Sequence, residues 1–169
     1  MNGARQNRDT RRSEKRTCSF AGHLRVSRAA DEARSLAGLF EDPERRRWAG
    51  ETLAGGRARA LVIERFAGAT WVALGFTVTA SDGETALALR VEERGKGLAR
   101  EALRAAVRVL REEPFSELSA SIEPDDARAV RTFEQAGFAP SGACRFRGRP
   151  STRYIRTLRG DCTPYNVWI

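Results

Sequence analysis

The stretch LALRVEERGKGLAREAL (residues 87–103) predicts a strand, a tight turn with two glycines and two cations, and the start of an amphipathic helix. The first N–H groups of a helix have no intrahelical partner and carry partial positive charge, so such a turn suits an anion. Gly95 and Gly97 let the backbone approach that anion without interference from a Cβ atom. The stretch therefore predicts a phosphate-binding turn between a strand and a helix.

The composition is that of one soluble globular domain with an excess of positive charge. The 169 residues include 30 Lys and Arg against 22 Asp and Glu, which gives a net charge of +8, and all but two of the cations are arginine. Such a balance favours anionic ligands, such as a nucleotide cofactor or RNA. Residues 1–20 are polar, charged and aperiodic, so we expect a basic disordered tail followed by a single domain over residues 21–169.

Several classes of site have no support in the sequence. No apolar run approaches the ~20 residues of a membrane-spanning helix, and the N-terminus lacks the apolar core of a signal peptide. The single histidine, His23, and three widely spaced cysteines form no metal-ligand pattern. We therefore expect a cytoplasmic protein with reduced thiols, no metal and no membrane partner.

The remaining pattern predicts an α+β fold in which an antiparallel meander leads into the phosphate turn. Alternating and β-branched segments predict strands, and apolar residues at helical spacing predict helices. The predicted strands span residues 23–27, 58–66, 70–79, 85–91, 118–122, 143–146 and 153–158, and the predicted helices span residues 31–40, 44–53, 98–110 and 127–136. Because a helix joins the fourth and fifth strands, we expect these two to be parallel within one mixed central sheet flanked by helices.

Two motifs resemble those of the GNAT superfamily of N-acetyltransferases. The first is RGKGLA, residues 94–99, which is similar to the family's Gln/Arg-x-x-Gly-x-Gly/Ala loop for the pyrophosphate of acetyl-CoA. The second is DDARAVRTFEQAGF, residues 125–138, which is similar to the family's Asn-x-x-Ala-x-x-x-Tyr-x-x-x-Gly-Phe segment. A helix and a strand separate the motifs in the family's order. The resemblance covers residues 22–159 and is strongest to aminoglycoside 6′-N-acetyltransferases.

The resemblance implies that acetyl-CoA is the co-substrate. It assigns hydrogen bonds with the pantetheine arm to the exposed backbone of Leu89, Arg90 and Val91, which would hold the arm like an added strand. A backbone N–H there would also stabilise the oxyanion that forms during acetyl transfer. The implied cofactor-binding residues are Leu89, Arg90, Val91, Arg94, Gly95, Lys96, Gly97, Leu98, Ala99, Asp126 and Phe133.

The predicted catalytic residue is Glu84. An ammonium is not a nucleophile, so a base or a chain of waters must take its proton. Glu84 lies ten residues before Arg94, near the place where some members of the family carry such a carboxylate. Other carboxylates remain open as alternatives, namely Asp82, Glu64, Glu92 and Asp126.

Two positions depart from the family's pattern. Phe133 stands in place of the tyrosine proposed to protonate the departing thiolate, and Asp126 stands in place of the usual asparagine. Phenylalanine cannot donate a proton, but a thiol with a pKa of about 8.5 leaves acceptably as a thiolate. Tyr154 is a candidate substitute if the last hairpin folds over the site.

The sequence therefore predicts an acetyl-CoA-dependent N-acetyltransferase that acts on a primary amine of a small molecule, such as an antibiotic or a metabolite. One alternative is a macromolecular amine, either a protein N-terminus or aminoacyl-tRNA, which a basic surface would suit. Another is a non-catalytic CoA-binding module, which Phe133 would suit. We expect residues 31–56 and 139–150 to build the acceptor pocket. Dimers are common in the superfamily, so we also consider a homodimer.

Overall fold

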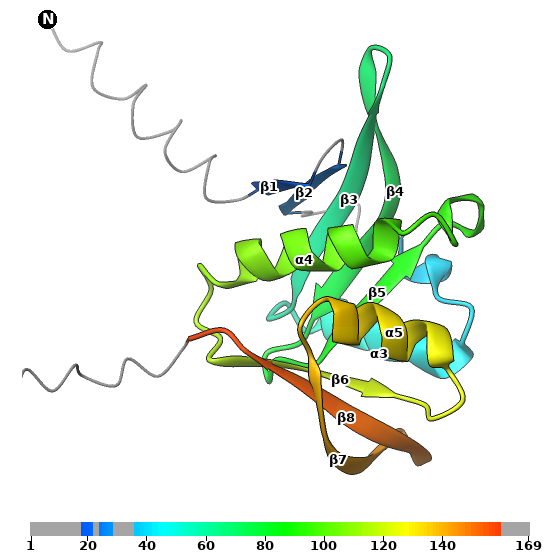
Figure 1. Ribbon diagram of the computed structural model, residues 1–169, viewed down its shortest axis with the longest axis vertical. Helices are drawn as coiled ribbons and strands as arrows, with labels where there is room; N and C mark the ends of the chain where they lie inside the picture. Colours follow the sequence, from blue (N-terminus) through cyan, green and yellow to red (C-terminus); the bar gives the residue numbers. More distant parts are fainter. Residues whose placement is uncertain (1–17, 22–23, 29–35, 160–169) are drawn as a thin grey trace, which may run out of the picture.

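The structure is a computed structural model that describes residues 18–21, 24–28 and 36–159 (Figure 1). Its strands form a five-stranded antiparallel sheet in the order β1-β2-β3-β4-β5 and a three-stranded antiparallel sheet in the order β6-β8-β7. The strands are β1 (Cys18–Ala21), β2 (Leu24–Arg28), β3 (Arg59–Ala67), β4 (Thr70–Thr79), β5 (Thr85–Leu89), β6 (Glu117–Ile122), β7 (Ala139–Phe146) and β8 (Arg149–Thr157). The helices are α3 (Pro43–Ala54), α4 (Leu98–Leu110) and α5 (Ala127–Gln135), with short 3₁₀ helices η1 (Ala37–Leu39) and η2 (Val91–Glu93).

Helix α4 covers one face of the five-stranded sheet (Figure 1). Its apolar residues recur with the helical period, and Ala102, Leu103 and Leu110 are completely buried. Only Arg104 and Arg108 of this helix are exposed. The same apolar cluster includes residues of α5 and β8, so α4 joins the two sheets into one core.

The opposite face of the sheet is covered by η1 and α3. The side chains of β5 alternate between the two faces: Ala86 and Ala88 pack in the cluster of η1 and α3, whereas Leu89 packs in the cluster of α4. The ring of Phe40 meets that of Phe76 edge-on, with centroids 5.4 Å apart. Residues 39–45 are thereby fixed beside β5, on the side away from α4.

The two sheets meet at a single parallel bridge between Glu84 and Ser119, the only bridge between β5 and β6 in the described part of the chain. The N–H of Ser119 donates to the carbonyl of Gly83 at 2.9 Å. Gly83 has a φ of +91°, and a Cβ atom there would lie 2.6 Å from the carbonyl oxygen of Glu117. Glycine is therefore required at this junction, and beyond it one edge of β5 is left without a neighbouring strand.

The predicted α+β fold and most of its elements are confirmed, with four differences. The strand expected through Val91 ends at Leu89, because the chain turns into η2. Strands four and five are parallel at one bridge only, so two sheets replace the single mixed sheet. Residues 18–20, expected in the tail, belong to β1, which pairs with β2. Residues 149–152, expected outside the last hairpin's strands, belong to β8, and Ala139 already begins β7.

Two other expectations concern the helix predicted from Asp31 and the absence of a membrane-spanning helix. The start of the helix expected from Asp31 lies outside the described residues, and of that segment the structure describes only residues 36–40, which include η1. Within the described residues, no helix is long and apolar enough to cross a membrane.

Candidate active site

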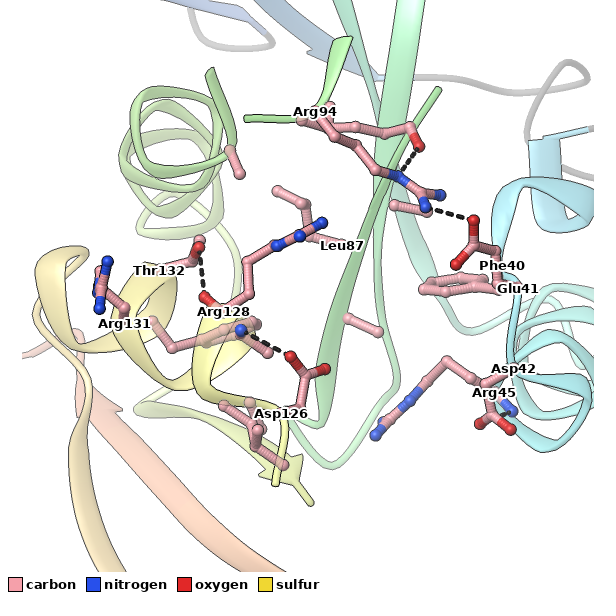
Figure 2. A pocket seen from close by; sticks show the side chains of 18 of the residues that line it. Phe40, Glu41, Asp42, Arg45, Leu87, Arg94, Asp126, Arg128, Arg131 and Thr132 are labelled. Carbon is pink, nitrogen blue, oxygen red and sulfur yellow. Dashed lines mark hydrogen bonds and ion pairs between the residues drawn. The ribbon is translucent and has the colours of Figure 1, made fainter. Parts of the chain in front are cut away.

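A cleft of about 1210 Å³ passes around the free edge of β5. Figure 2 shows that one side of it carries Arg128 and Thr132 from α5, and the other side carries Phe40 and Asp42 from the segment before α3 and Arg45 from its first turn. The cleft therefore has two halves, one beside the N-terminus of α4 and one beside the N-terminus of α3.

The glycine turn opens into the first half of the cleft. Gly95 and Gly97 have φ values of +73° and +75°, and Gly97 is the N-cap of α4 without any side-chain capping hydrogen bond. Apart from the adjacent residues and the backbone of α4 itself, no atom of the described residues lies within 4 Å of where a Cβ atom would sit on either glycine. Lys96 is the one residue of the turn that does not line the cleft, and its ammonium pairs with Glu93 at 3.3 Å. The uncapped helix terminus therefore leaves backbone donors and open space for an anion.

Along β5, the backbone N–H and C=O groups of successive residues point in turn towards β4 and towards the free edge of the strand. The carbonyl of Glu84 accepts from Ala80 on the β4 side, and the N–H of Arg90 donates to the carbonyl of Leu74 at 2.8 Å. Since backbone polar groups alternate along a strand, the N–H and C=O groups of Leu87 and Leu89 face the cleft instead. The carbonyl of Leu89 already accepts from Nε of Arg94 at 3.1 Å, so an extended ligand would meet the N–H groups of both residues and the carbonyl of Leu87.

Two of the three predicted pantetheine-binding residues are placed elsewhere. The N–H of Arg90 is engaged by β4, and its guanidinium donates to the carbonyl of Ala73 at 2.8 Å. Val91 begins η2 and is 66% exposed, and neither residue lines the cleft. Leu89 lines it as expected, together with Leu87, which the sequence reasoning missed although strand alternation pairs it with Leu89.

The side chain of Arg94 leaves the glycine turn and crosses to the other half of the cleft (Figure 2). Its Nε donates to the carbonyl of Leu89 at 3.1 Å, and its terminal nitrogens donate to the carboxylate of Glu41 and to the carbonyl of Leu39 at 3.5 Å. The resemblance placed Arg94 in the pyrophosphate loop. Only its backbone lies there, while the guanidinium holds the wall in front of α3.

The second motif forms the start and inner face of α5. Asp126 is the N-cap of this helix and accepts from the N–H of Ala129 at 3.0 Å. Phe133 is 6% exposed, lines the cleft and packs edge-on against Phe138 with ring centroids 5.0 Å apart. Both predicted residues therefore lie at the cleft, Asp126 as a helix cap and Phe133 as an apolar wall.

Glu84, the predicted base, lies at the junction of the sheets and does not line the cleft. Its carboxylate accepts from Ser119 Oγ at 3.0 Å and from the N–H of Ser121 at 2.8 Å, and it lies 3.8 Å from a guanidinium nitrogen of Arg45. Arg45 stacks over the ring of Phe146 at 3.7 Å and donates to the carbonyl of Ser121 at 2.6 Å. Burial lowers the pKa of Arg45, and the charge of Glu84 opposes that shift. The carboxylate thus links β5, β6 and α3.

The other carboxylates considered as bases are mostly engaged away from the cleft. Asp82 accepts from the N–H of Glu84 at 3.0 Å, and Glu64 binds the guanidinium of Arg25 at 2.8 Å. Of the five carboxylates proposed from the sequence, Asp126 alone lines the cleft. Tyr154 is buried on β8 and does not line it.

The comparisons with known proteins agree with this geometry. Residues 23–139 match the family described as "Acetyltransferase (GNAT) domain". The chain belongs to the GNAT acetyltransferase family.

Solved structures similar to this GNAT chain share its fold. A variant of the spermidine N-acetyltransferase SpeG from Vibrio cholerae has a TM-score of 0.61 and 16% identity, covering 80% of this chain and 94% of that chain. Aminoglycoside acetyltransferase AAC(6')-Ib in complex with coenzyme A and kanamycin has a TM-score of 0.60 and 17% identity, covering 79% and 94%. Ribosomal-protein-S5-alanine acetyltransferase from Vibrio fischeri has a TM-score of 0.62 and 12% identity, covering 84% and 97%. A search of curated proteins found no match.

The first half of the cleft in this GNAT domain fits the phosphates of a coenzyme A thioester, the acetyl donor that GNAT enzymes use. Uncapped N–H groups and two glycines without Cβ atoms form the cradle. Arg100 lines the same region, and its Nε is buried without a hydrogen-bond partner among the described residues. Arg128 and Arg131 of α5 line the cleft, and Figure 2 shows the side chain of Arg128 extending towards Leu87. The donors and charges present therefore suit a polyanionic end group.

The sequence reasoning missed the acidic residues of the second half. Glu41, Asp42 and Glu123 line the cleft there. Glu41 and Asp42 lie in residues 31–56, which the sequence predicts to help build the acceptor pocket, whereas Glu123 lies outside both predicted segments. Nothing in the local pattern distinguishes these carboxylates from ordinary surface charges.

Proposed function

We propose that this acetyltransferase transfers an acetyl group from acetyl-CoA to a primary amine of a small molecule, such as an antibiotic or a metabolite. The observation that carries the proposal is the uncapped N-terminus of α4 at Gly97, which opens into a cleft that also exposes the free edge of β5. A helix terminus suits phosphates, and an unpaired strand edge suits the amides of a pantetheine arm.

The reaction requires positioning more than dedicated chemical groups. Acetyl-CoA supplies an activated acyl thioester; the amine nitrogen bonds to the acyl carbon, the carbon–sulfur bond breaks and the thiolate leaves. The amine gives its proton to a base or to water. Holding the two reactants in line supplies several kcal/mol of the barrier, on the order of 7–11 in the best cases. In this proposal the backbone of Leu87 and Leu89 orients the pantetheine arm, and the N–H groups at residues 97–99 hold the pyrophosphate.

Phe133 and Glu84 are the residues of the two motifs and the junction that bear on proton transfer. Phe133 has no proton to donate, so the sulfur leaves as a thiolate that is protonated by water. Glu84 stays a prediction as the base. Its engaged oxygens support a second role, in which it positions Arg45 and the start of β5.

Cofactor binding and turnover test the proposal together. We expect calorimetry to show binding of coenzyme A, and a thiol-release assay with acetyl-CoA and a panel of primary amines to show turnover with an acetylated amine detected by mass spectrometry. The trimethylated form of each reactive amine is the matched control, because it has no N–H to replace. Coenzyme A binding without turnover on any amine would favour a non-catalytic module, and turnover only on a protein N-terminus or aminoacyl-tRNA would favour a macromolecular acceptor.

A further inference from the structure

Glu93 places a carboxylate beside the anion cradle. It ends η2 two residues before Gly95 and lines the cleft next to the glycine turn, and only 12% of its side chain is exposed. Like charges that face each other in a binding site disfavour binding. A phosphate in the cradle would therefore meet a negative charge unless the protein cancels it.

Two cations outside the cleft lining surround this carboxylate. The guanidinium of Arg65, on β3, donates two hydrogen bonds to Glu93, at 3.0 and 3.1 Å, and the ammonium of Lys96 lies 3.3 Å from one of the same oxygens. Desolvation raises the pKa of Glu93, but the hydrogen bonds that its carboxylate accepts from Arg65 and Lys96 lower the pKa by more, so the group is charged. Two positive charges and one negative charge therefore leave an excess of one positive charge, and without Arg65 that excess disappears.

The other charges that line this half of the cleft do not supply a clear excess. The charged side chains of Glu93, α4 and residues 125–135 in the lining are three guanidiniums and three carboxylates. They are Arg100, Arg128, Arg131, Asp125, Asp126 and Glu93 itself. The guanidinium of Arg94 binds Glu41 in the other half, and Glu92 is exposed and does not line the cleft. An excess of full positive charge that would attract a pyrophosphate therefore depends on Arg65 and Lys96.

We propose that Arg65 is a positioning residue for the pyrophosphate of coenzyme A, which acts through Glu93 by cancelling the charge of that carboxylate and leaving the charge of Lys96 in excess at the glycine turn. The inference rests on the proposed acetyltransferase function and adds a residue to its cofactor site. Arg65 lies outside both sequence motifs, 28 positions before Glu93.

Calorimetry of coenzyme A binding to four forms of the full chain tests this role, because the summed charge of the three groups differs among them. The sum is +2 in Glu93→Gln, +1 in the parent and in the double variant Arg65→Gln/Glu93→Gln, and zero in Arg65→Gln. We expect Kd to rise about fivefold in Arg65→Gln, to return to within about twofold of the parent in the double variant, and to fall in Glu93→Gln. The rise should shrink at high salt, since Arg65 is partly exposed. The KM of acetyl-CoA should follow Kd while kcat stays within about twofold, because Arg65 does not line the cleft.

Arg25→Gln is the matched control, because it breaks an equivalent pair of hydrogen bonds, with Glu64, outside the cleft lining and should leave Kd unchanged. Lys96→Gln also lowers the sum to zero and provides a second route if Arg65→Gln fails to fold. A double variant that binds as weakly as Arg65→Gln would overturn the proposal, because the contact and not its charge would then matter. Unchanged binding in folded Arg65→Gln and Lys96→Gln would overturn it too, while leaving the acetyltransferase function intact. No binding of coenzyme A by the parent chain would remove both.

Discussion

Substitutions of Glu84 distinguish a proton acceptor from a structural link between the two sheets. In Glu84→Ala, two hydrogen bonds to a charged acceptor are lost, from Ser119 Oγ at 3.0 Å and from the Ser121 N–H at 2.8 Å. Arg45, whose side chain is 16% exposed, also loses the carboxylate that lies 3.8 Å away. Breaking a buried ion pair by removing one partner costs about 3–5 kcal/mol.

We expect the lower end of that range for Glu84→Ala, because Arg45 keeps its hydrogen bond to the Ser121 carbonyl and its stacking on Phe146. A loss of about 3 kcal/mol corresponds to a fall in melting temperature of about 6–12 °C for a domain of this size. Glu84→Gln keeps an oxygen for the Ser121 N–H but no charge for Arg45, so its loss should be smaller, about 1–2 kcal/mol.

The assay combines thermal unfolding with kcat, measured below the melting temperature of each variant. A structural link predicts that Glu84→Gln lowers the melting temperature while kcat stays within about tenfold of the parent value, since only positioning is affected. A general base predicts that kcat also falls by about 10²–10⁴ and loses its acidic limb, which the loss of the structural contacts alone would not cause. Glu117→Gln is the control on the neighbouring strand, because its exposed pair with Arg153 is worth only about 0–1 kcal/mol.

Three further predictions test the loop, the cap and an acidic pair. Gly97→Ala should weaken coenzyme A binding by at least about tenfold in calorimetry, because a Cβ atom at a φ of +75° is strained and enters the anion cradle; Gly68→Ala, at a φ of +69° in the β3–β4 turn, should leave binding unchanged. Asp126→Ala should lower the free energy of unfolding by about 1 kcal/mol, whereas Asp126→Asn should retain the cap of α5, as measured by denaturant titration. Desolvation raises the pKa of Asp42, but the hydrogen bonds that its carboxylate accepts from Arg149 and from the N–H groups of α3 lower the pKa by more. The folded-state pKa of Asp42 therefore lies below its usual value. Its contribution to stability should therefore be full above a pH of about 4 and disappear as the pH falls through the folded-state pKa, and melting curves of Asp42→Asn should lack that part of the acid dependence.

Local patterns predicted the elements that form the first half of the cleft, beside the N-terminus of α4. The helical period of residues 98–110 and the glycines before it suffice to place α4 and its uncapped start, because both depend on neighbours within one or two turns. Asp126 was recognisable as a helix start for the same reason. Strand alternation also predicts that Leu87 lines the cleft, because residues two apart on β5 face the same side and Leu89 lines it.

The second half of the cleft, beside the N-terminus of α3, was not predictable residue by residue. Arg94 meets Glu41 across 53 positions of sequence, and Arg149 meets Asp42 across 107. Such pairs depend on how η1, α3 and β8 pack around β5. A charged residue in a polar segment has no periodic signal that would reveal its partner.

The sequence by itself determined a strand, a glycine turn and an amphipathic helix within residues 87–103, together with the family to which they belong. Only the tertiary structure decided that the guanidinium of Arg94 leaves the glycine turn and reaches Glu41, that Arg90 is engaged by β4, and that Glu84 joins two sheets at one bridge. The physical reason is the range of the interactions. Turn geometry, helix caps and strand alternation are settled by adjacent residues, whereas the direction of a long side chain is settled by the charges and carbonyls that distant elements bring to it.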